Sequence, residues 1–235
     1  MKGIRDRVAI IGMGCTKFGE NWDKSAPDML VDACYEAFED AGVDPQKDVE
    51  AAWMSFCFPS AGAGSGFTGQ NLSVPLKFGY RPVTRVENHC ASGSDALRNG
   101  AYAVAAGIYD IVLVAGVEKL KDTGFAGLPF ASPMLDPTLT EVMSHTVPPT
   151  HFAMAANRYF HHYGIDPEEG KRTLAKIAVK NHHNGTLSPK AHLQREVTIE
   201  QVLNAPIIAW PLGLFDCCTN SDGAAAAIIT RPELA

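Results

Sequence analysis

The sequence lacks any hydrophobic run long enough to cross a membrane, and it also lacks a long run of lysine or arginine. Its formal net charge is −6, which excludes a general attraction to nucleic acid or to an anionic membrane surface. The apolar run Val8–Met13 is too short for the core of a signal peptide and contains a glycine. With 235 residues, 46% of them hydrophobic, the chain can bury a full core, so we expect one large or two small soluble domains.

Cysteine is scarce and irregularly spaced. The six cysteines include one adjacent pair, Cys217–Cys218, and no C-x-x-C motif, which excludes a zinc ribbon and favours reduced thiols in a cytoplasmic protein. Two adjacent histidine pairs, His161–His162 and His182–His183, invite a metal interpretation. Neighbouring residues of a helix point in different directions, and no cysteine or carboxylate spacing completes a ligand set. We therefore predict no metal site.

Two common glycine motifs are incomplete as well. Gly12 and Gly14 follow an apolar run, but Lys17 stands where a dinucleotide-binding fingerprint needs a third glycine. Ser65 has Ala63 two residues before it, so the nucleophile elbow of serine hydrolases is not met. These departures argue against a nucleotide cofactor and against a serine nucleophile.

What the first 117 residues do contain is an alternation of strand and helix patterns. This order predicts parallel strand pairing with helices on the faces of the sheet, and hence an α/β domain. A small-residue helix closed by Gly107 has compact positions nearly all round, which is typical of a helix packed in the interior. The other expected elements are strands at Val8–Ile11, Ala51–Cys57, Val83–Glu87 and Tyr109–Ala115, a helix between Ser25 and Gly42, and a short helix near Thr68–Phe78.

The regular alternation of strand and helix patterns stops after residue 117. From Glu118 to Thr150 the chain has no clear period, and an irregular stretch of this length is usually functional or an excursion from the core. Helical patterns return at His151–Tyr163 and Pro167–Asn184, and a third short helix opens with the capping box Thr198-x-x-Gln201. Ile207–Leu212 and Ala224–Thr230 are expected as closing strands.

The residue best placed for chemistry is Cys90, where a strand ends and a helix begins. Ala91, Ser92 and Gly93 follow it, and their small side chains would let a substrate approach the backbone. A helix N-terminus favours thiolate, the nucleophilic form, and its free N–H groups could hold the oxyanion of a tetrahedral intermediate. On the residues alone the alternative is a buried structural cysteine, since free cysteine is among the most buried residue types.

The segment around Cys90 resembles the nucleophile segment of the thiolases. It reads E-N-H-C-A-S-G-S-D-A-L over Glu87–Leu97 and leads to D-I-V-L-V-A-G-V-E over Asp110–Glu118, in the family's order and spacing. The match extends over essentially the whole chain. Four further segments are similar to the sterol-carrier-protein-type branch: Phe152–Tyr159, Tyr163–Gly164, Ala178–His182 and Ser221–Ala224.

This resemblance implies a thiolase-like fold, a mixed sheet with helices on both faces and an inserted helical loop domain. The expected division is residues 1–117 for the core with the nucleophile, 118–205 for the loop domain that helps bind coenzyme A, and 206–235 for the closing strands of the core. Cys90 maps onto the cysteine that becomes acylated. The implied enzyme is an acetyl-CoA C-acyltransferase that makes or cleaves a carbon–carbon bond of a β-ketoacyl-CoA, with coenzyme A as a substrate and no cofactor bound by the chain.

Several substrate-binding residues follow from the resemblance or from charge. Thr150–Ala156 resembles a stretch that lies against the pantetheine and acyl group, so His151 and Phe152 would face the substrate, although a histidine that opens a helix is more often a surface residue. Lys176 and Lys180 belong to a stretch with six basic residues and no acidic one, which would attract a coenzyme A phosphate or would simply be a solvated helix face. Phenylalanines in loops could line an acyl pocket: Phe58, Phe67, Phe125 and Phe130.

Thiolases have a second half similar to the first, which supplies the proton-transfer residues, and its G-H-P and C-x-G motifs do not occur here. We therefore expect a C-terminal half on the same or a separate chain, a homo-oligomer, and possible association with a zinc-ribbon and oligonucleotide-fold protein. Alternatives are a condensing enzyme of the ketoacyl synthase or hydroxymethylglutaryl-CoA synthase kind and a non-catalytic binding or assembly subunit. A related branch catalyses aldol cleavage without the cysteine, and Cys90 argues against that branch.

Overall fold

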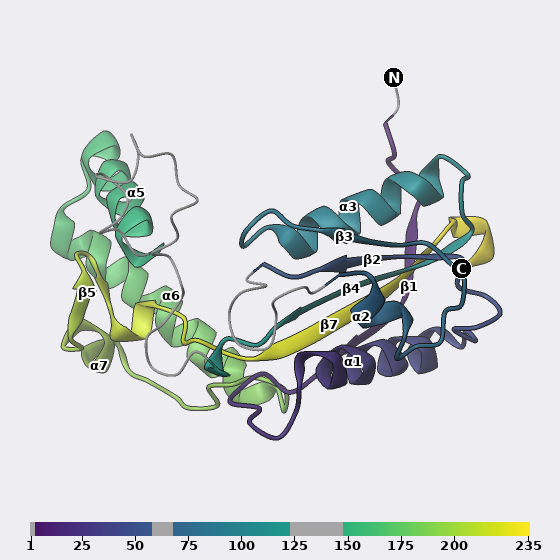
Figure 1. Cartoon of the computed structure of the whole chain (residues 1–235). Coiled ribbons are helices and arrows are strands. Elements are labelled where there is room, and N and C mark those ends of the chain that lie inside the picture. Colours follow the sequence, from purple (N-terminus) through teal and green to yellow (C-terminus); the bar gives the residue numbers. More distant parts are fainter. Residues whose placement is uncertain (1–2, 58–67, 123–147) are drawn as a thin grey trace, which may run out of the picture. The chain divides into compact units, whose positions relative to one another are not determined.

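The computed structural model describes residues 3–57, 68–122 and 148–235. The chain divides into two compact units, the first formed by Met1–Gly127 with Ser221–Ala235 and the second by Leu128–Asn220 (Figure 1). Within the described ranges, no helix has both the length and the apolar character that crossing a bilayer requires. The expected loop domain ended at 205, whereas the second unit continues to Asn220.

The first unit is built on a five-stranded mixed sheet with the strand order β1-β7-β4-β2-β3. Strand β7 runs antiparallel to both of its neighbours, β1 and β4, while β2 pairs in parallel with β4 and β3. The α/β fold predicted from the alternation is therefore confirmed, with one antiparallel strand from the far end of the chain inserted into it. The strands are β1 (Ala9–Cys15), β2 (Ala51–Ser55), β3 (Val83–Val86), β4 (Ile111–Glu118) and β7 (Gly223–Thr230).

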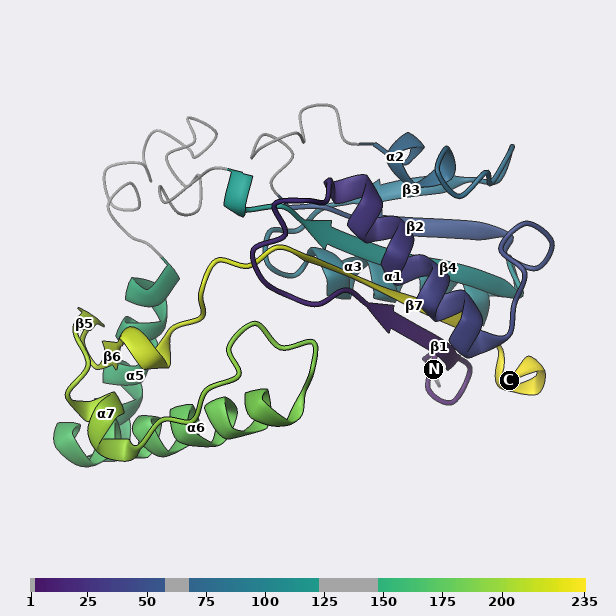
Figure 2. The ribbon, with the colours of Figure 1, turned by 90° about the horizontal axis from the view of Figure 1, so that it is seen from below.

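Helix α1 (Ala26–Ala41) covers one face of this sheet, and Figure 2 shows it on the side opposite to α3 (Ser92–Ala105). The helix begins and ends where expected: Ser25 and Asp28 form a capping box by satisfying each other's backbone N–H groups, and Gly42 ends the helix in the left-handed conformation. The short helix α2 (Gln70–Ser73) contributes Leu72 to the same core. The largest buried side chains of this cluster are Met29, Leu30, Met54, Phe56, Leu76, Phe78, Leu113 and Ile228.

Strand β1 and helix α1 approach each other along their main chains. A Cβ atom added to Gly14 would lie 2.2 Å from the Ala33 carbonyl oxygen, so only glycine fits there. Two α1 carboxylates also accept from backbone N–H groups of this edge strand, Asp40 from Met13 and Glu36 from Cys15, each at 2.9 Å. Gly12 and Gly14, which do not complete a dinucleotide-binding motif, are therefore explained by the close packing of β1 against α1.

Helix α3 covers only part of the second face. Its inner side packs on β2, β4 and β7 through a cluster of Ala51, Ala96, Val104, Val112, Val114 and Ile229. Its outer side leaves Leu97 and Tyr102 exposed, so the expectation of a helix buried nearly all round was wrong. Met13 pairs with Ala227, which pairs with Val114 of that cluster, so Met13 belongs to the α3 face, yet it is 63% exposed. The apolar surface of this face therefore extends beyond what α3 covers.

The second unit is helical, with α5 (Pro148–Tyr163), α6 (Pro167–Leu187) and α7 (Ile199–Leu203). The capping box Thr198–Gln201 opens α7 as predicted. The segment 207–212 does not join the main sheet as a closing strand, and that expectation was wrong: β5 (Ile207–Ala209) and β6 (Leu212–Gly213) form a separate two-stranded sheet. Short 3₁₀ helices are formed by Leu214–Asp216 in this unit and by Pro232–Leu234 in the first.

Candidate active site

Cys90 is exposed and lies in a tight turn between the end of β3 and the start of α3. The preceding residue, His89, has a backbone φ of 46°, a left-handed conformation that is uncommon for residues other than glycine. Such outliers concentrate where the surrounding structure holds a functional group in place. The position predicted for Cys90, at a strand-to-helix junction, is confirmed.

A buried serine fixes this turn. The Oγ atom of Ser92 accepts from the Asn88 N–H at 2.9 Å and donates to the His89 carbonyl oxygen at 2.5 Å. The N–H groups of Ala91 and Ser92 donate to the carbonyl oxygens of Asn88 and His89, at 2.9 and 3.0 Å. The oxyanion of an intermediate on Cys90 therefore cannot accept from these two N–H groups without breaking the turn. Any backbone N–H group that stabilises the oxyanion must belong to another residue.

The ends of the neighbouring parallel strands bring further side chains to the same edge of the sheet. Cys57 follows β2, which lies between β3 and β4, and its N–H donates to a carboxylate oxygen of Glu118 at the end of β4. Burial, reinforced by the charges of Glu118, Glu87 and Cys90, raises the pKa of Cys57 to about 12, against a smaller opposing effect of Arg85. Cys57 is therefore a protonated thiol at neutral pH. Sequence reasoning missed both residues, although each comes at the end of a strand.

A buried ion pair stabilises this end of the sheet next to β7. Asp222 is fully buried and accepts from the Lys119 ammonium group at 2.9 Å and from the N–H of Lys121 at 2.8 Å. Burial alone would lower the pKa of Lys119, but its hydrogen bonds to Asp222 and Asp122 outweigh burial and raise it. The pair joins the end of β4 to the start of β7, so we assign it a structural role.

In the second unit, the predicted substrate-binding residues lie on two helices. His151 and Phe152 are exposed on α5, with 69% of Phe152 accessible. Lys176 and Lys180 are exposed on α6 at turn spacing, which places them on one helix face. Lys171, another of the six basic residues in the stretch 171–195, is buried and forms an ion pair with Asp216, so it is not available to a phosphate.

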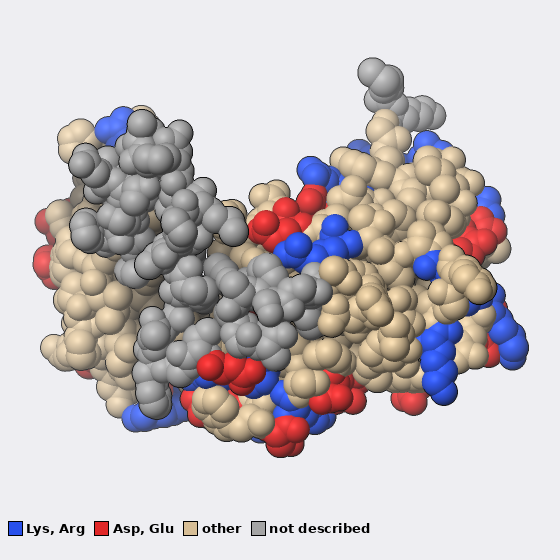
Figure 3. All heavy atoms as spheres, viewed as in Figure 1, with Lys and Arg blue, Asp and Glu red and all other residues tan. Residues whose placement is uncertain are grey.

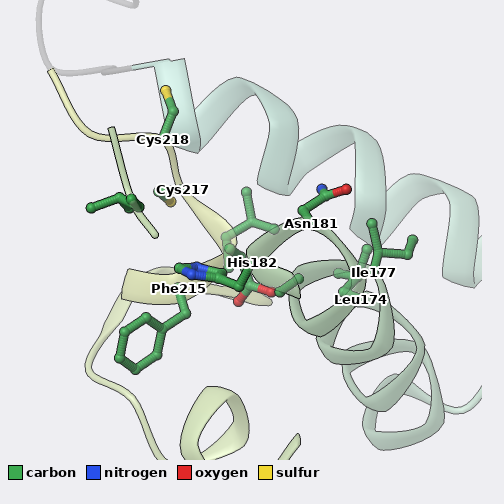
Figure 4. Close-up of a pocket in the computed structure, with 11 residues that line it drawn as sticks. Leu174, Ile177, Asn181, His182, Phe215, Cys217 and Cys218 are labelled. Carbon is green, nitrogen blue, oxygen red and sulfur yellow. The ribbon is translucent and has the colours of Figure 1, made fainter. Parts of the chain in front are cut away.

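A hollow of about 390 Å³ lies beside α6 in this unit (Figure 4). His182 lines it and stacks edge-on against Phe215, with 5.8 Å between ring centroids. The His182 Nδ1 atom lies 3.2 Å from the Arg195 carbonyl oxygen, and the Nδ1 atom of the neighbouring His183 lies 2.8 Å from a Glu196 carboxylate oxygen, so the two imidazoles contact successive residues. The remaining wall consists of Leu174, Ile177, Ala178, Asn181, Leu193, Leu212, Asp216, Cys217 and Cys218.

Charged side chains of both signs are interspersed over the face of the first unit that Figure 3 displays.

The four phenylalanines considered for an acyl pocket, Phe58, Phe67, Phe125 and Phe130, lie outside the described residues.

Comparison with known proteins fits this arrangement. The family model for the thiolase N-terminal domain matches residues 8–233. The chain belongs to the thiolase family. The resemblance seen in the nucleophile segment is thereby confirmed, as is the thiolase-like fold.

Three similar proteins illustrate the range of the family. The chain is 39% identical to an acetyl-CoA acetyltransferase of Methanothermobacter thermautotrophicus, covering 99% of this chain and 58% of that protein. It is 33% identical to sterol carrier protein 2 of Gallus gallus, covering 98% of this chain and 42% of that protein. A solved structure described as the Ltp2-ChsH2(DUF35) aldolase matches with a TM-score of 0.80 and 25% identity, covering 98% and 57%. The chain thus spans about half the length of these thiolase relatives.

Proposed function

We propose that this chain carries the acyl-accepting cysteine of an acyl-CoA acyltransferase, an acetyl-CoA C-acyltransferase of the thiolase type. The observation that carries the proposal is the exposed Cys90 thiol, held in a left-handed turn at the start of a fourteen-residue helix. The relative named acetyl-CoA acetyltransferase supports the same reaction class. No cofactor is needed for this chemistry, since coenzyme A is a substrate.

In the proposed reaction the Cys90 thiolate attacks the carbonyl carbon of an acyl-CoA thioester. A carbon–sulfur bond forms, the carbonyl oxygen takes the charge of the tetrahedral intermediate, and coenzyme A leaves as its thiolate, leaving an acyl group on Cys90. With a β-ketoacyl-CoA the leaving group is the enolate of a shorter thioester, so the same cysteine serves carbon–carbon cleavage or, in reverse, its formation. Cys57, with its raised pKa, stays protonated and does not compete as a nucleophile.

The second unit is proposed to contact coenzyme A. Lys176 and Lys180 would bind a phosphate from one face of α6, and His151 and Phe152 would face the pantetheine and acyl group from α5. The aromatic ring of Phe152 supports this role, because it is a large apolar side chain that is 69% exposed and lies outside the core cluster of the second unit's described residues.

We propose further that a C-terminal thiolase half, on the same or a separate chain, covers the open part of the α3 face. Leu97, Tyr102 and Met13 expose apolar surface there, which is costly to leave in water. That half would supply the proton-transfer residues. Homo-oligomer formation and a zinc-ribbon and oligonucleotide-fold partner are proposed on the family's behaviour, and the aldolase structure named with ChsH2(DUF35) supports a partner protein.

Intact-protein mass spectrometry after incubation with acetyl-CoA tests the role of Cys90. We expect an acetyl mass on the wild type and none on Cys90→Ser, because serine is a far weaker nucleophile at neutral pH. Cys218→Ser, which removes an exposed thiol in the other unit, is the matched control and should keep the adduct. Binding of acetyl-CoA without an adduct would favour a non-catalytic subunit. Aldol cleavage, the activity in the name of the aldolase structure, would need no Cys90.

Calorimetric titration with coenzyme A tests the helix α6 surface. The double variant Lys176→Glu/Lys180→Glu should bind at least about tenfold more weakly, since hydrogen bonds to a charged group contribute about 1.5–3 kcal/mol each. Lys17→Glu/Lys77→Glu makes the same change of net charge on exposed lysines of the first unit and should leave the affinity within twofold. Equal affinities for both double variants would show that only net charge matters.

A further inference from the structure

Three potential metal ligands converge at the edge of the sheet that carries Cys90. The Cys57 sulfur, a Glu87 carboxylate oxygen and a His89 ring nitrogen all lie within 4.8 Å of one another. The topology brings them together: Ser55 and Val86 are paired across the parallel strands β2 and β3, so the residues just beyond both strands emerge side by side (Figure 1).

The chemistry of the three donors matches one class of cation. Thiolate, imidazole and carboxylate together are typical of zinc and related borderline divalent metals, whereas magnesium and calcium select oxygen ligands. Zinc sites that react with other molecules have three protein ligands and an open fourth position. Tetrahedral zinc with bonds of about 2.0–2.3 Å holds its ligands about 3.5 Å apart, so side-chain shifts of about 1 Å would close this set.

The backbone already holds two of the three ligands together. The N–H of His89 donates to a carboxylate oxygen of Glu87 at 2.6 Å, and the left-handed conformation of His89 is part of the turn that Ser92 fixes. Ligands organised in this way lose little conformational freedom when a metal binds. Both side chains are exposed, which leaves the site open to ions from solvent.

The charges around Cys57 favour a cation as well. Glu118, Glu87 and Cys90 place negative charge near its sulfur, and Arg85 provides the opposing positive charge while it donates to the Phe56 carbonyl oxygen. A divalent ion at this position would be attracted by the nearby Glu118 and Glu87 carboxylates. Metal binding transfers the Cys57 proton to solvent and forms the sulfur–metal bond.

We propose that Cys57, Glu87 and His89 form a binding site for a zinc-class divalent cation, with its open coordination position toward Cys90. Cys90 is the next residue after His89 but is not one of the three clustered donors, so its side chain would have to shift for its sulfur to take the open position as a fourth ligand. A consequence that rests on the proposed acyl transfer is regulation: an occupied site withholds Cys90 from acyl-CoA, and removal of the metal restores acylation.

Titration of the whole chain with Co²⁺, under a phosphine reductant that leaves no added thiol, tests the site itself. A thiolate ligand gives cobalt a sulfur-to-metal charge-transfer absorption, which we expect at one equivalent in the wild type. Cys57→Ser should lower it and Cys57→Ser/Cys90→Ser should abolish it, while Glu87→Gln and His89→Gln, both on exposed side chains, should weaken Zn²⁺ competition by roughly ten- to hundredfold. The Cys217→Ser/Cys218→Ser double variant removes the vicinal thiols of the other unit and should retain the absorption.

Two results would overturn the site: no charge-transfer absorption in the wild type, or an absorption that survives Cys57→Ser/Cys90→Ser but disappears in Cys217→Ser/Cys218→Ser. A second arm separates the site from the proposed function. Zn²⁺ should suppress acetylation of Cys90 and a chelator should restore it in the wild type, with no zinc effect in Glu87→Gln. Absent acetylation without metal would contradict the acyl-transfer proposal alone, whereas acetylation indifferent to Zn²⁺ would contradict the regulatory consequence.

Discussion

Among the described residues, each unit of the molecule buries a lysine against an aspartate, but the two aspartates have different surroundings. In the first unit Asp222 accepts from the Lys119 ammonium group and from the backbone N–H groups of Lys121 and Asn21. In the second unit Asp216 accepts from Lys171 and from the Gly213 N–H through one oxygen. Its other oxygen is buried with no hydrogen-bond partner among the residues that the structure describes.

The first unit also has more buried apolar packing than the second. The first unit has a large cluster under α1 and a second cluster under α3, whereas the cluster described in the second unit has four buried members: Ala175, Ala178, Val197 and Val202. A buried ion pair stabilises a fold only as far as its surroundings satisfy both charges. The comparison indicates that the same pair of residue types contributes more in the first unit than in the second.

The largest expected effect is that of Asp222→Ala. It leaves the buried Lys119 ammonium group with the Asp122 carboxylate and the Trp22 ring as its partners among the described residues, which should cost about 3–5 kcal/mol of unfolding free energy. Hydrogen exchange of peptides from β4 and β7 measures the loss locally. Asp122→Ala, on the more exposed partner, should cost less than about 1 kcal/mol, and equal losses in both variants would contradict the assignment.

The same pair should make stability depend on alkaline pH. The pKa of Lys119 is raised in the fold above its ordinary value of 10.5, so its stabilising contribution is complete below that value and is lost as pH rises through the folded pKa. Unfolding free energy in the wild type should therefore stay level up to about pH 10 and fall as pH rises above 10.5. Asp222→Ala should show a shallower fall over this range, since the partner that raises the pKa is missing.

Asp216→Ala should have a smaller effect, about 1–3 kcal/mol, and it should be confined to peptides of α6 and the segment after β6. The substitution removes the partner of Lys171, but it also removes an oxygen that is itself unsatisfied. Asp216→Asn separates the two contributions, because it keeps the shape and loses the charge. A cost equal to that of Asp222→Ala would refute the difference drawn between the units.

The capping boxes give the smallest and most evenly matched comparison. Ser25→Ala in the first unit and Thr198→Ala in the second each remove one side-chain acceptor at a helix start, and each should cost about 1 kcal/mol. Exchange at the first turns of α1 and α7 reports the loss. Because α7 has five residues, against sixteen in α1, we expect its first turn to open more than that of α1. The reverse order would mean that local helix length does not decide the outcome.

Local rules predicted much of this molecule. The alternation of strand and helix, both capping boxes, the position of Gly42 and the placement of Cys90 at a strand-to-helix junction follow from short-range patterns, and the structure contains all of them. Helix amphipathicity and capping depend on residues within one or two turns, so a sequence displays them directly.

What could not be predicted depends on which strands become neighbours. Cys57 and Glu118 meet because β2 lies beside β4, and the order of strands leaves no trace in either segment. The 207–212 segment is apolar enough for the main sheet, but a short run does not specify its partner, and it pairs within the second unit. A lysine on a helix is usually exposed to solvent, so the burial of Lys171 could not be predicted from its own segment. Its ion pair with Asp216, 45 residues later in the chain, compensates the buried charge.

The contact between β1 and α1 has a consequence for the behaviour of this chain in concentrated solution. An edge strand with free N–H groups is a template on which another polypeptide can add a strand, and it is thereby a route to aggregation. On β1 the N–H groups of Met13 and Cys15 already donate to the carboxylates of Asp40 and Glu36. An incoming strand would have to displace both carboxylates and face their charge, so this edge of the sheet is protected against aggregation by its own helix.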